Sequence, residues 1–216
     1  MKKCAVILSG CGLYDGSEIH ESTLLSYFLD LHDISITFLA PNIDQADCID
    51  HSTGKAMANT SRNCLIESAR IARGPVNDIN EKLADEFDMA IFSGGYGAAK
   101  NLSTFAIDNE NLSINLSVKN FILAMNKKIK PLGFLCISPV IAAKLFPKLK
   151  CTLGLDQSNL DILTKMGASA IQANYDDVVF DAAYNIYSTP AYMIDTSISK
   201  IALGIEKLVV SIKDSL

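Results

Sequence analysis

The sequence predicts an α/β fold in which helices cover a mainly parallel β-sheet. Short apolar runs alternate with segments of helical periodicity along the whole chain, an order typical of parallel sheets. Hydrophobic residues make up 49% and charged residues 20% of the 216 residues, which is the composition of a folded globule. No linker, low-complexity tract or internal repeat interrupts the pattern, so we expect one domain over residues 1–216.

The first half of the chain contains short apolar runs that are each followed within two residues by glycine or proline. They predict strands at Cys4–Leu8, Ser35–Leu39 and Asp88–Phe92. Helical spacing of apolar residues predicts a helix from about Ser17 to Leu31. A further helix contains residues 64–71 and stops at Gly74-Pro75, because this dipeptide ends helices.

The second half of the chain continues the alternation. Strands are expected at Pro131–Leu135, Val178–Phe180 and Ile186–Ser188. Helices are expected at Leu116–Lys127, Pro139–Leu145 and Asp156–Met166. A last helix runs through Val210, with Asp195 as its N-cap.

Charge and cysteine pattern exclude several classes of function. The net charge is −5 and no Lys/Arg cluster could track a phosphate backbone, so we expect no nucleic-acid partner. No apolar run is long enough to cross a membrane, and the first one stops at Ser9, too early for a signal peptide. None of the six cysteines forms C-x-x-C, so we expect no zinc site and no redox pair. Free thiols and the missing export signal indicate a cytoplasmic protein.

Two glycine-rich turns follow expected strands. In the first, the glycines at positions 10, 12 and 16 do not fit the G-x-G-x-x-G spacing of dinucleotide-binding proteins. In the second, Gly94 and Gly95 follow a buried strand directly, which would expose backbone N–H groups able to stabilise an oxyanion. A tight turn without a ligand is the alternative for both segments.

Cys136 is the most informative single residue. It lies between an expected strand and an expected helix, at the edge of the sheet where α/β proteins place ligands. The positive end of the helix dipole would favour the thiolate, so we expect a nucleophile with a lowered pKa. A buried structural cysteine is the alternative, because cysteine is among the most often buried residues.

Glu18 and Glu21 open the first long helix and share one of its faces. This helix also begins at the carboxyl edge of the sheet, so both carboxylates could reach the same crevice as Cys136. Compensation of the helix dipole at the surface is the alternative for both.

These segments together resemble one family, the bacterial ElbB glyoxalases, which are also described as isoprenoid-biosynthesis proteins. The family lies within the ThiJ/PfpI group of class I glutamine amidotransferase-like proteins. The matching segments are Val6–Glu21, Ser61–Ile71, Gly94–Ser103, Gly133–Pro139 and Ser188–Met193. The resemblance covers nearly the whole chain.

The resemblance implies a flavodoxin-like three-layer sandwich with a nucleophile elbow, a single ThiJ/PfpI-like domain and a homodimer. It also implies a cofactor-free and metal-free reaction on a small aldehyde or dicarbonyl, converting glyoxal to glycolate, with methylglyoxal as a second substrate candidate. In that comparison Cys136 matches the nucleophile, and Glu21 matches the facing carboxylate better than Glu18 does. Gly95 and Ile137 match the N–H donors of the oxyanion hole, and Gly94 and Asn101 complete the expected pocket.

Two positions depart from the wider superfamily. Ile137 stands where amidotransferases and many proteases have histidine, which argues against glutaminase or peptidase activity. Ser93 replaces a proline that precedes the two glycines in many relatives. A redox sensor that uses a reactive cysteine, or a regulatory protein that binds a metabolite in the same pocket, remains the alternative to an enzyme.

Overall fold

The computed structural model describes residues 1–216 and contains a central sheet with the strand order β10-β11-β7-β6-β1-β2-β5. The strands are β1 (Lys2–Ile7), β2 (Ile34–Ala40), β5 (Asn77–Asp78), β6 (Met89–Phe92), β7 (Leu132–Leu135), β10 (Val179–Asp181) and β11 (Ile186–Thr189). All neighbouring strands run parallel except β10 and β11, which are antiparallel. The expected mainly parallel sheet is therefore confirmed.

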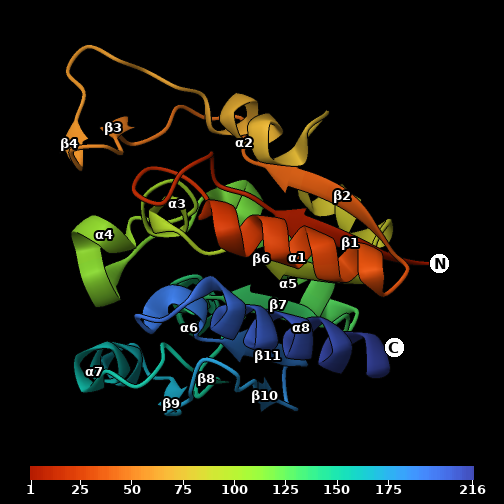
Figure 1. Ribbon diagram of the computed structural model, residues 1–216. Coiled ribbons are helices and arrows are strands. Elements are labelled where there is room, and N and C mark those ends of the chain that lie inside the picture. The colour runs from red at the N-terminus through yellow and green to blue at the C-terminus, as the bar shows by residue number, and fades with distance from the viewer.

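Helices cover both faces of this sheet, so the molecule has three layers. One face carries the helices α1 (Ile19–Leu31), α2 (Cys64–Ala72) and α8 (Ile198–Asp214). The other face carries α3 (Tyr96–Lys100), α4 (Phe105–Asp108), α5 (Leu116–Lys127), α6 (Pro139–Leu145) and α7 (Gln157–Lys165), with the 3-10 turns η1 (Glu81–Asp85) and η2 (Asn109–Asn111). Figure 1 shows α1 and α8 side by side across the first face. This is the flavodoxin-like arrangement that the family resemblance implies.

The position of β1 in the sheet explains why the run Cys4–Leu8, which includes Leu8 just after the strand, is apolar throughout. Ala5 and Ile7 pack into the core beneath α5 and α6, whereas Cys4, Val6 and Leu8 pack into the core beneath α1 and α8. All five side chains are fully buried. A strand that is covered on both faces has no polar side, as is usual in parallel sheets.

Some elements were not predicted. The chain between β2 and α2 makes an excursion that contains the hairpin β3 (Ile49–Asp50) and β4 (Lys55–Ala56), and Figure 1 shows it projecting from the body. A short parallel pair, β8 (Lys150–Cys151) and β9 (Ser169–Ala170), is also new, as is the 3-10 turn η3 (Ala191–Met193). Two-residue strands carry no readable periodicity, so the sequence offers no signal for them.

The last helix differs from its expected bounds. Its N-cap is Ser197 rather than Asp195, because residue 197 is still extended, with φ −75° and ψ 154°. The helix continues past Val210 to Asp214, since Ile212 is buried against the sheet and extends the apolar face. No helix combines the length and apolar character that crossing a membrane requires.

The order of the strands sets the position of the site. From β1 the chain moves outward through β2 and β5, and it then returns to the opposite side of β1 with β6. Connections after β1 and β6 therefore diverge, which opens a crevice at the carboxyl ends of these strands. The two chain termini lie near each other, away from this crevice (Figure 1). The side-chain amine of Lys2 donates to the Leu216 carbonyl at 3.3 Å.

Candidate active site

Cys136 occupies a strained turn directly after β7. Its φ of +58° is in the left-handed region, which non-glycine residues rarely adopt. Its N–H donates to the Thr189 carbonyl at 3.1 Å, and the Ser138 hydroxyl donates to the Leu135 carbonyl at 2.8 Å. These bonds hold the turn between β7 and α6, so the backbone has the nucleophile elbow that the sequence predicts.

Glu21 faces this cysteine from the first turn of α1. The side chain is fully buried, and its Oε1 accepts a hydrogen bond from the Tyr192 N–H at 3.1 Å. Its Oε2 has no hydrogen-bond partner of normal geometry and lies beside Gly94 and the Cys136 thiol. A Cβ at Gly94 would collide with both Oε2 and the Cys136 side chain, so only glycine allows the acid and the thiol to meet here.

Two backbone N–H groups point toward the Cys136 sulfur, those of Gly95 and Ile137. Neither donates to a backbone carbonyl. Gly95 has a φ of +95°, and a Cβ there would collide with the backbone of Gly16 and Glu18. These N–H groups are therefore fixed and available to a negative charge on sulfur or on an oxygen bound next to it.

Burial controls the proton affinity of both reactive groups. It raises the pKa of Glu21 to about 8, with a further contribution from the charge of Glu18. The pKa of Cys136 is raised well above its ordinary value, mainly by burial and then by the charge of Glu21. The lowered thiol pKa expected from the helix N-terminus is therefore wrong, because burial beside a carboxylate outweighs the two N–H groups.

Glu18 has a different position from Glu21, although the two are separated by less than one helical turn. It is the N-cap of α1, and its Oε2 accepts a hydrogen bond from the Glu21 N–H at 2.7 Å. Its carboxylate is thus occupied by the end of the helix. Glu18 affects the reactive pair through its negative charge, which raises the pKa of Glu21.

Asn101 does not line the expected pocket. Its amide nitrogen donates to the carbonyls of Ser9 and Asp15 at 2.8 and 2.9 Å, and its amide oxygen accepts from the Ala46 N–H at 2.9 Å. It braces the turn after β1 against the excursion that follows β2. The same turn contains a fully buried carboxylate, Asp15, which accepts a hydrogen bond from the Ile49 N–H at 2.7 Å.

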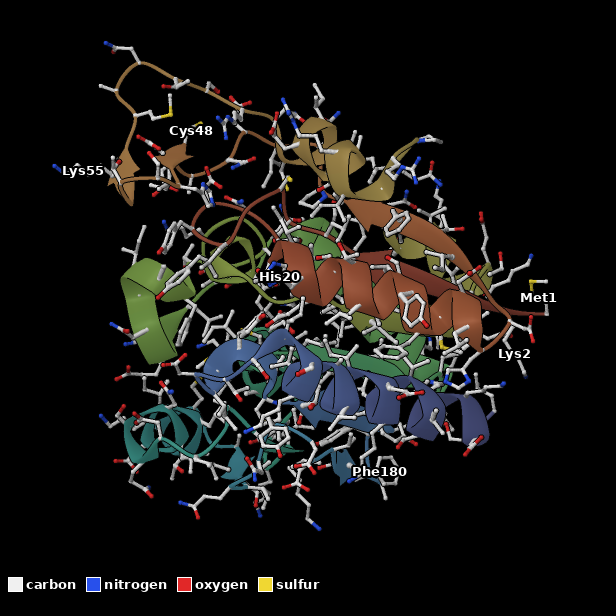
Figure 2. The ribbon with its side chains drawn as sticks, in the orientation of Figure 1. Met1, Lys2, His20, Cys48, Lys55 and Phe180 are labelled. Atoms are coloured by element: carbon white, nitrogen blue, oxygen red, sulfur yellow. The ribbon has the colours of Figure 1, made fainter.

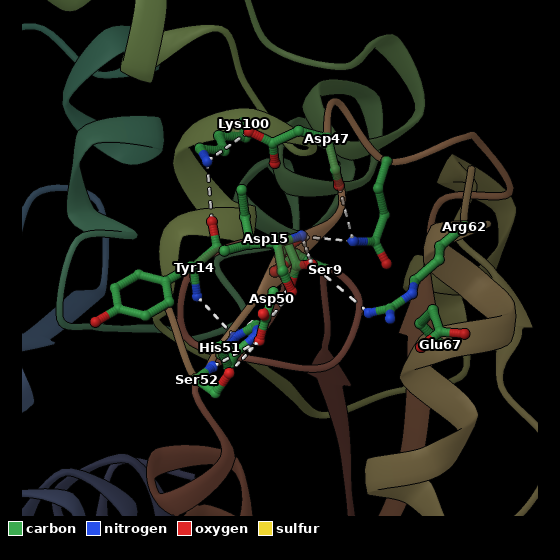
Figure 3. A network of polar contacts seen from close by, with 12 residues as sticks. Ser9, Tyr14, Asp15, Asp47, Asp50, His51, Ser52, Arg62, Glu67 and Lys100 are labelled. Carbon is green, nitrogen blue, oxygen red and sulfur yellow. Dashed lines mark hydrogen bonds and ion pairs between the residues drawn. The ribbon is translucent and has the colours of Figure 1, made fainter. Parts of the chain in front are cut away.

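Figure 3 shows the polar contacts around Asp15. His51 and Arg62 approach this carboxylate from the excursion, each at 3.7 Å. His51 has no ligand-like neighbours in the sequence, which predicts a surface residue, and its side chain is indeed exposed. Its contacts with Asp15 and with the Tyr14 N–H depend on tertiary packing and have no local signal.

A cavity of about 380 Å³ opens above the Cys136 sulfur. Leu13, Tyr96, Phe105, Ile137, Tyr192 and Met193 contribute to its walls. Cys136 itself is only 6% exposed, so a reactant reaches the thiol through this cavity. No histidine lines it.

Tyr192 connects the cavity with the start of α1. Its hydroxyl lies 2.9 Å from Nδ1 of His20, which Figure 2 shows at the beginning of that helix. Its backbone N–H orients Glu21, as described above. Sequence reasoning did not single out Tyr192, although it lies in the matching segment Ser188–Met193.

Comparison with known proteins assigns the family. No family model matches the chain. The human glutamine amidotransferase-like class 1 domain-containing protein 3, mitochondrial, is 37% identical over 216 residues, which cover 96% of this chain and 81% of that protein. The rat ES1 protein homolog, mitochondrial, is 36% identical over the same shares of the two chains.

This chain belongs to the ES1 family of glutamine amidotransferase-like class 1 domain proteins. A solved structure from Ehrlichia chaffeensis, an isoprenoid biosynthesis protein with an amidotransferase-like domain, agrees in fold with this ES1-family chain. The TM-score is 0.91 at 39% identity, and the match covers 99% of each chain. Drosophila melanogaster DJ-1beta shares the fold only, with a TM-score of 0.53 at 17% identity.

Proposed function

We propose that the protein is a cofactor-independent glyoxalase that converts glyoxal or methylglyoxal to the corresponding hydroxy acid through a hemithioacetal on Cys136. The observation that carries this proposal is the buried pair of Cys136 and Glu21, which lies beneath a mainly apolar cavity beside two N–H groups that donate to no backbone carbonyl. The resemblance of the surrounding segments to ElbB glyoxalases supports the same chemistry.

The first step needs a base, because the pKa of the thiol is raised. The Glu21 carboxylate takes the thiol proton as the sulfur adds to the aldehyde carbon. The C=O bond becomes a C–O⁻ group, which the N–H groups of Gly95 and Ile137 can stabilise. Protonation of this oxygen by Glu21 gives the neutral hemithioacetal and restores the carboxylate.

The second step moves a proton between the two substrate carbons. Glu21 removes the proton from the carbon that carries sulfur, and the electron pair moves through the new C=C bond onto the neighbouring carbonyl oxygen, which gives an enediolate. The hydroxyl proton of the hemithioacetal passes to that oxygen, and Glu21 returns its proton to the neighbouring carbon, so that the former C–OH group becomes the C=O of a thioester on Cys136 and the neighbouring carbon carries the hydroxyl group. One substrate carbon is thereby oxidised and the other reduced, so no external oxidant is needed. Water then hydrolyses the thioester to the hydroxy acid and the free thiol.

The environment of the thiol supports an enzyme over a redox sensor. Sensor cysteines are exposed and have a lowered pKa. Cys136 is buried and its pKa is raised. A thiol of this kind is a weak nucleophile until a bound substrate and an adjacent base activate it.

The test is turnover of glyoxal and methylglyoxal by the purified protein, with the product identified by NMR. We expect Cys136→Ala to abolish formation of glycolate and lactate. Cys11→Ala is the matched control, because Cys11 also follows a strand but lies in the turn after β1. The proposal fails if the wild-type protein forms neither acid, or if the Cys136 variant forms them at the wild-type rate.

We also propose that the protein acts in the cytoplasm as a homodimer. All six cysteines are free, which suits a reducing compartment. The dimer rests on the resemblance alone, and sedimentation equilibrium would test it.

A further inference from the structure

The cavity above Cys136 is much larger than glyoxal requires. Its volume of about 380 Å³ falls in the range of roughly 300–1,000 Å³ that is usual for drug-sized ligands. Glyoxal has four non-hydrogen atoms and fills about the space of two or three water molecules, at roughly 30 Å³ each. Most of the cavity would stay unfilled around such a substrate.

The walls of the cavity are mainly apolar. Nine of the twelve residues that line it are hydrophobic, and they come from separate elements. Tyr96 and Ala99 lie on α3, Phe105 and Ala106 on α4, and Met193 on η3. A ring or a branched aliphatic chain would bury apolar surface here, whereas glyoxal has no such surface to bury.

The charges near the cavity disfavour an anionic substrate. No Lys or Arg lines it, and Glu18 and Glu21 lie next to its floor. Lys100 lies 5.8 Å from the centre of the Tyr96 ring, but it forms an ion pair with Asp47 at 2.8 Å. The remaining polar lining consists mainly of the neutral amides of Asn109 and Asn159.

We infer that the preferred substrate is an uncharged 2-oxoaldehyde with an aromatic or branched aliphatic substituent. The reactive aldehyde would lie at Cys136, and the substituent would fill the space between α3, α4 and Met193. A hydroxyl group on the substituent would find hydrogen-bond partners in the amides of Asn109 and Asn159. This inference rests on the proposed function for its reaction and on the cavity for its specificity.

The first experiment compares kcat/KM for glyoxal, phenylglyoxal and 4-carboxyphenylglyoxal. Each methylene-sized apolar group in a fitting pocket is worth about 10- to 200-fold in specificity. We therefore expect phenylglyoxal to exceed glyoxal by on the order of 100-fold. The carboxylate analogue should lose at least about tenfold relative to phenylglyoxal, because its charge finds no cation.

A pair of neighbouring variants on α4 tests where the substituent binds. Ala106 lines the cavity, whereas the next residue, Ile107, is 78% exposed and does not. Ala106→Trp should lower the ratio of kcat/KM for phenylglyoxal over glyoxal by about tenfold or more. Ile107→Trp should leave this ratio as in the wild type. Equal ratios in the two variants would overturn the inference.

A second readout does not depend on turnover. The rate of alkylation of Cys136 is measured by mass spectrometry with 2-bromoacetophenone and with bromoacetone, each relative to its rate with free cysteine. We expect the aromatic reagent to label Cys136 faster, relative to free cysteine, and we expect Ala106→Trp to remove this preference. This result supports the inference even if the protein forms no hydroxy acid. In that case only the proposed reaction fails. If the protein turns over glyoxal but prefers neither the larger reagent nor the larger substrate, the proposed reaction is supported and the inference about the substituent is overturned.

Discussion

At the scale of single residues, Glu18 and Glu21 show how helix geometry separates two similar side chains. The Glu18 carboxylate accepts the N-cap hydrogen bond from the Glu21 N–H, so only the Glu21 carboxylate faces the thiol. The two acids therefore differ in function although they are three residues apart. Glu18 caps helix α1, and Glu21 lies beside the Cys136 thiol.

This difference gives the first prediction. Glu21→Gln removes the base but keeps the shape of the side chain, so kcat should fall on the order of 100- to 10,000-fold. Glu18→Gln should lose much less, because an amide oxygen can still cap α1. Steady-state kinetics of both variants measures the loss of kcat, and their Tm values show whether a loss comes from unfolding. The assignment is wrong if Glu18→Gln abolishes turnover and Glu21→Gln does not.

The second prediction concerns the pH dependence of the reaction. Glu21 must be ionised to accept the thiol proton, so kcat/KM should rise with pH and reach half of its maximum near pH 8, the pKa of this acid. Glu18→Gln removes a negative charge that raises this pKa, so the midpoint should move to lower pH. Glu67→Gln is the control, because Glu67 pairs with Arg70 on α2. An unchanged or higher midpoint in Glu18→Gln would contradict the prediction.

At the scale of elements, the site depends on loops that are braced from a distance. The turn after β1 carries Leu13 into the cavity and leads into α1, and Asn101 holds this turn from the end of α3. That one amide bonds to three backbone groups, of which only the Asp15 carbonyl has a second side-chain donor, the Gln45 amide at 2.8 Å. Asn101 thus contributes to the site by positioning it.

The third prediction follows from this brace. Asn101→Ala leaves the Ser9 carbonyl and the Ala46 N–H without their partner and removes one of the two donors to the Asp15 carbonyl, at a cost of about 2–4 kcal/mol in the free energy of unfolding. Urea denaturation measures this loss, with the half-buried Asn120→Ala in α5 as a control that should change little. A loss below 1 kcal/mol in Asn101→Ala would show that water replaces the amide.

At the scale of the whole molecule, the buried acid links the site to stability. The pKa of Glu21 is about 8 in the folded protein, against an ordinary value of 4.5. Between these values the folded state keeps a proton that the unfolded state releases. Stability rises with pH only where the unfolded state binds more protons, so here the contribution of Glu21 falls as pH rises.

The fourth prediction is the measurable form of this linkage. The free energy of unfolding of the wild type, relative to that of Glu21→Gln, should decrease from pH 5 to pH 8 by up to about 1.4 kcal/mol per pH unit. Urea denaturation of both proteins across this range provides the comparison. Parallel curves for the two proteins would mean that Glu21 is already ionised at pH 5.

The sequence by itself determines much of this molecule. Apolar runs and glycine or proline stops place β1, β2, β6, β7 and most of the long helices, because periodicity and chain breaks are local properties. The position of Cys136 at a strand-to-helix turn is predicted for the same reason, and the family resemblance implies that this turn is a nucleophile elbow. The carboxyl-edge rule predicts that the turns after β1, β6 and β7 meet.

Only the tertiary structure decides how the groups in these turns act. It assigns Glu18 to the helix end and Glu21 to the thiol, and it reverses the expected direction of the pKa shift of Cys136. It also moves Asn101 from the pocket to a brace and encloses a cavity with residues from α3, α4 and η3. Burial and side-chain pairing arise between segments far apart in the chain, and these long-range contacts set proton affinity and cavity shape.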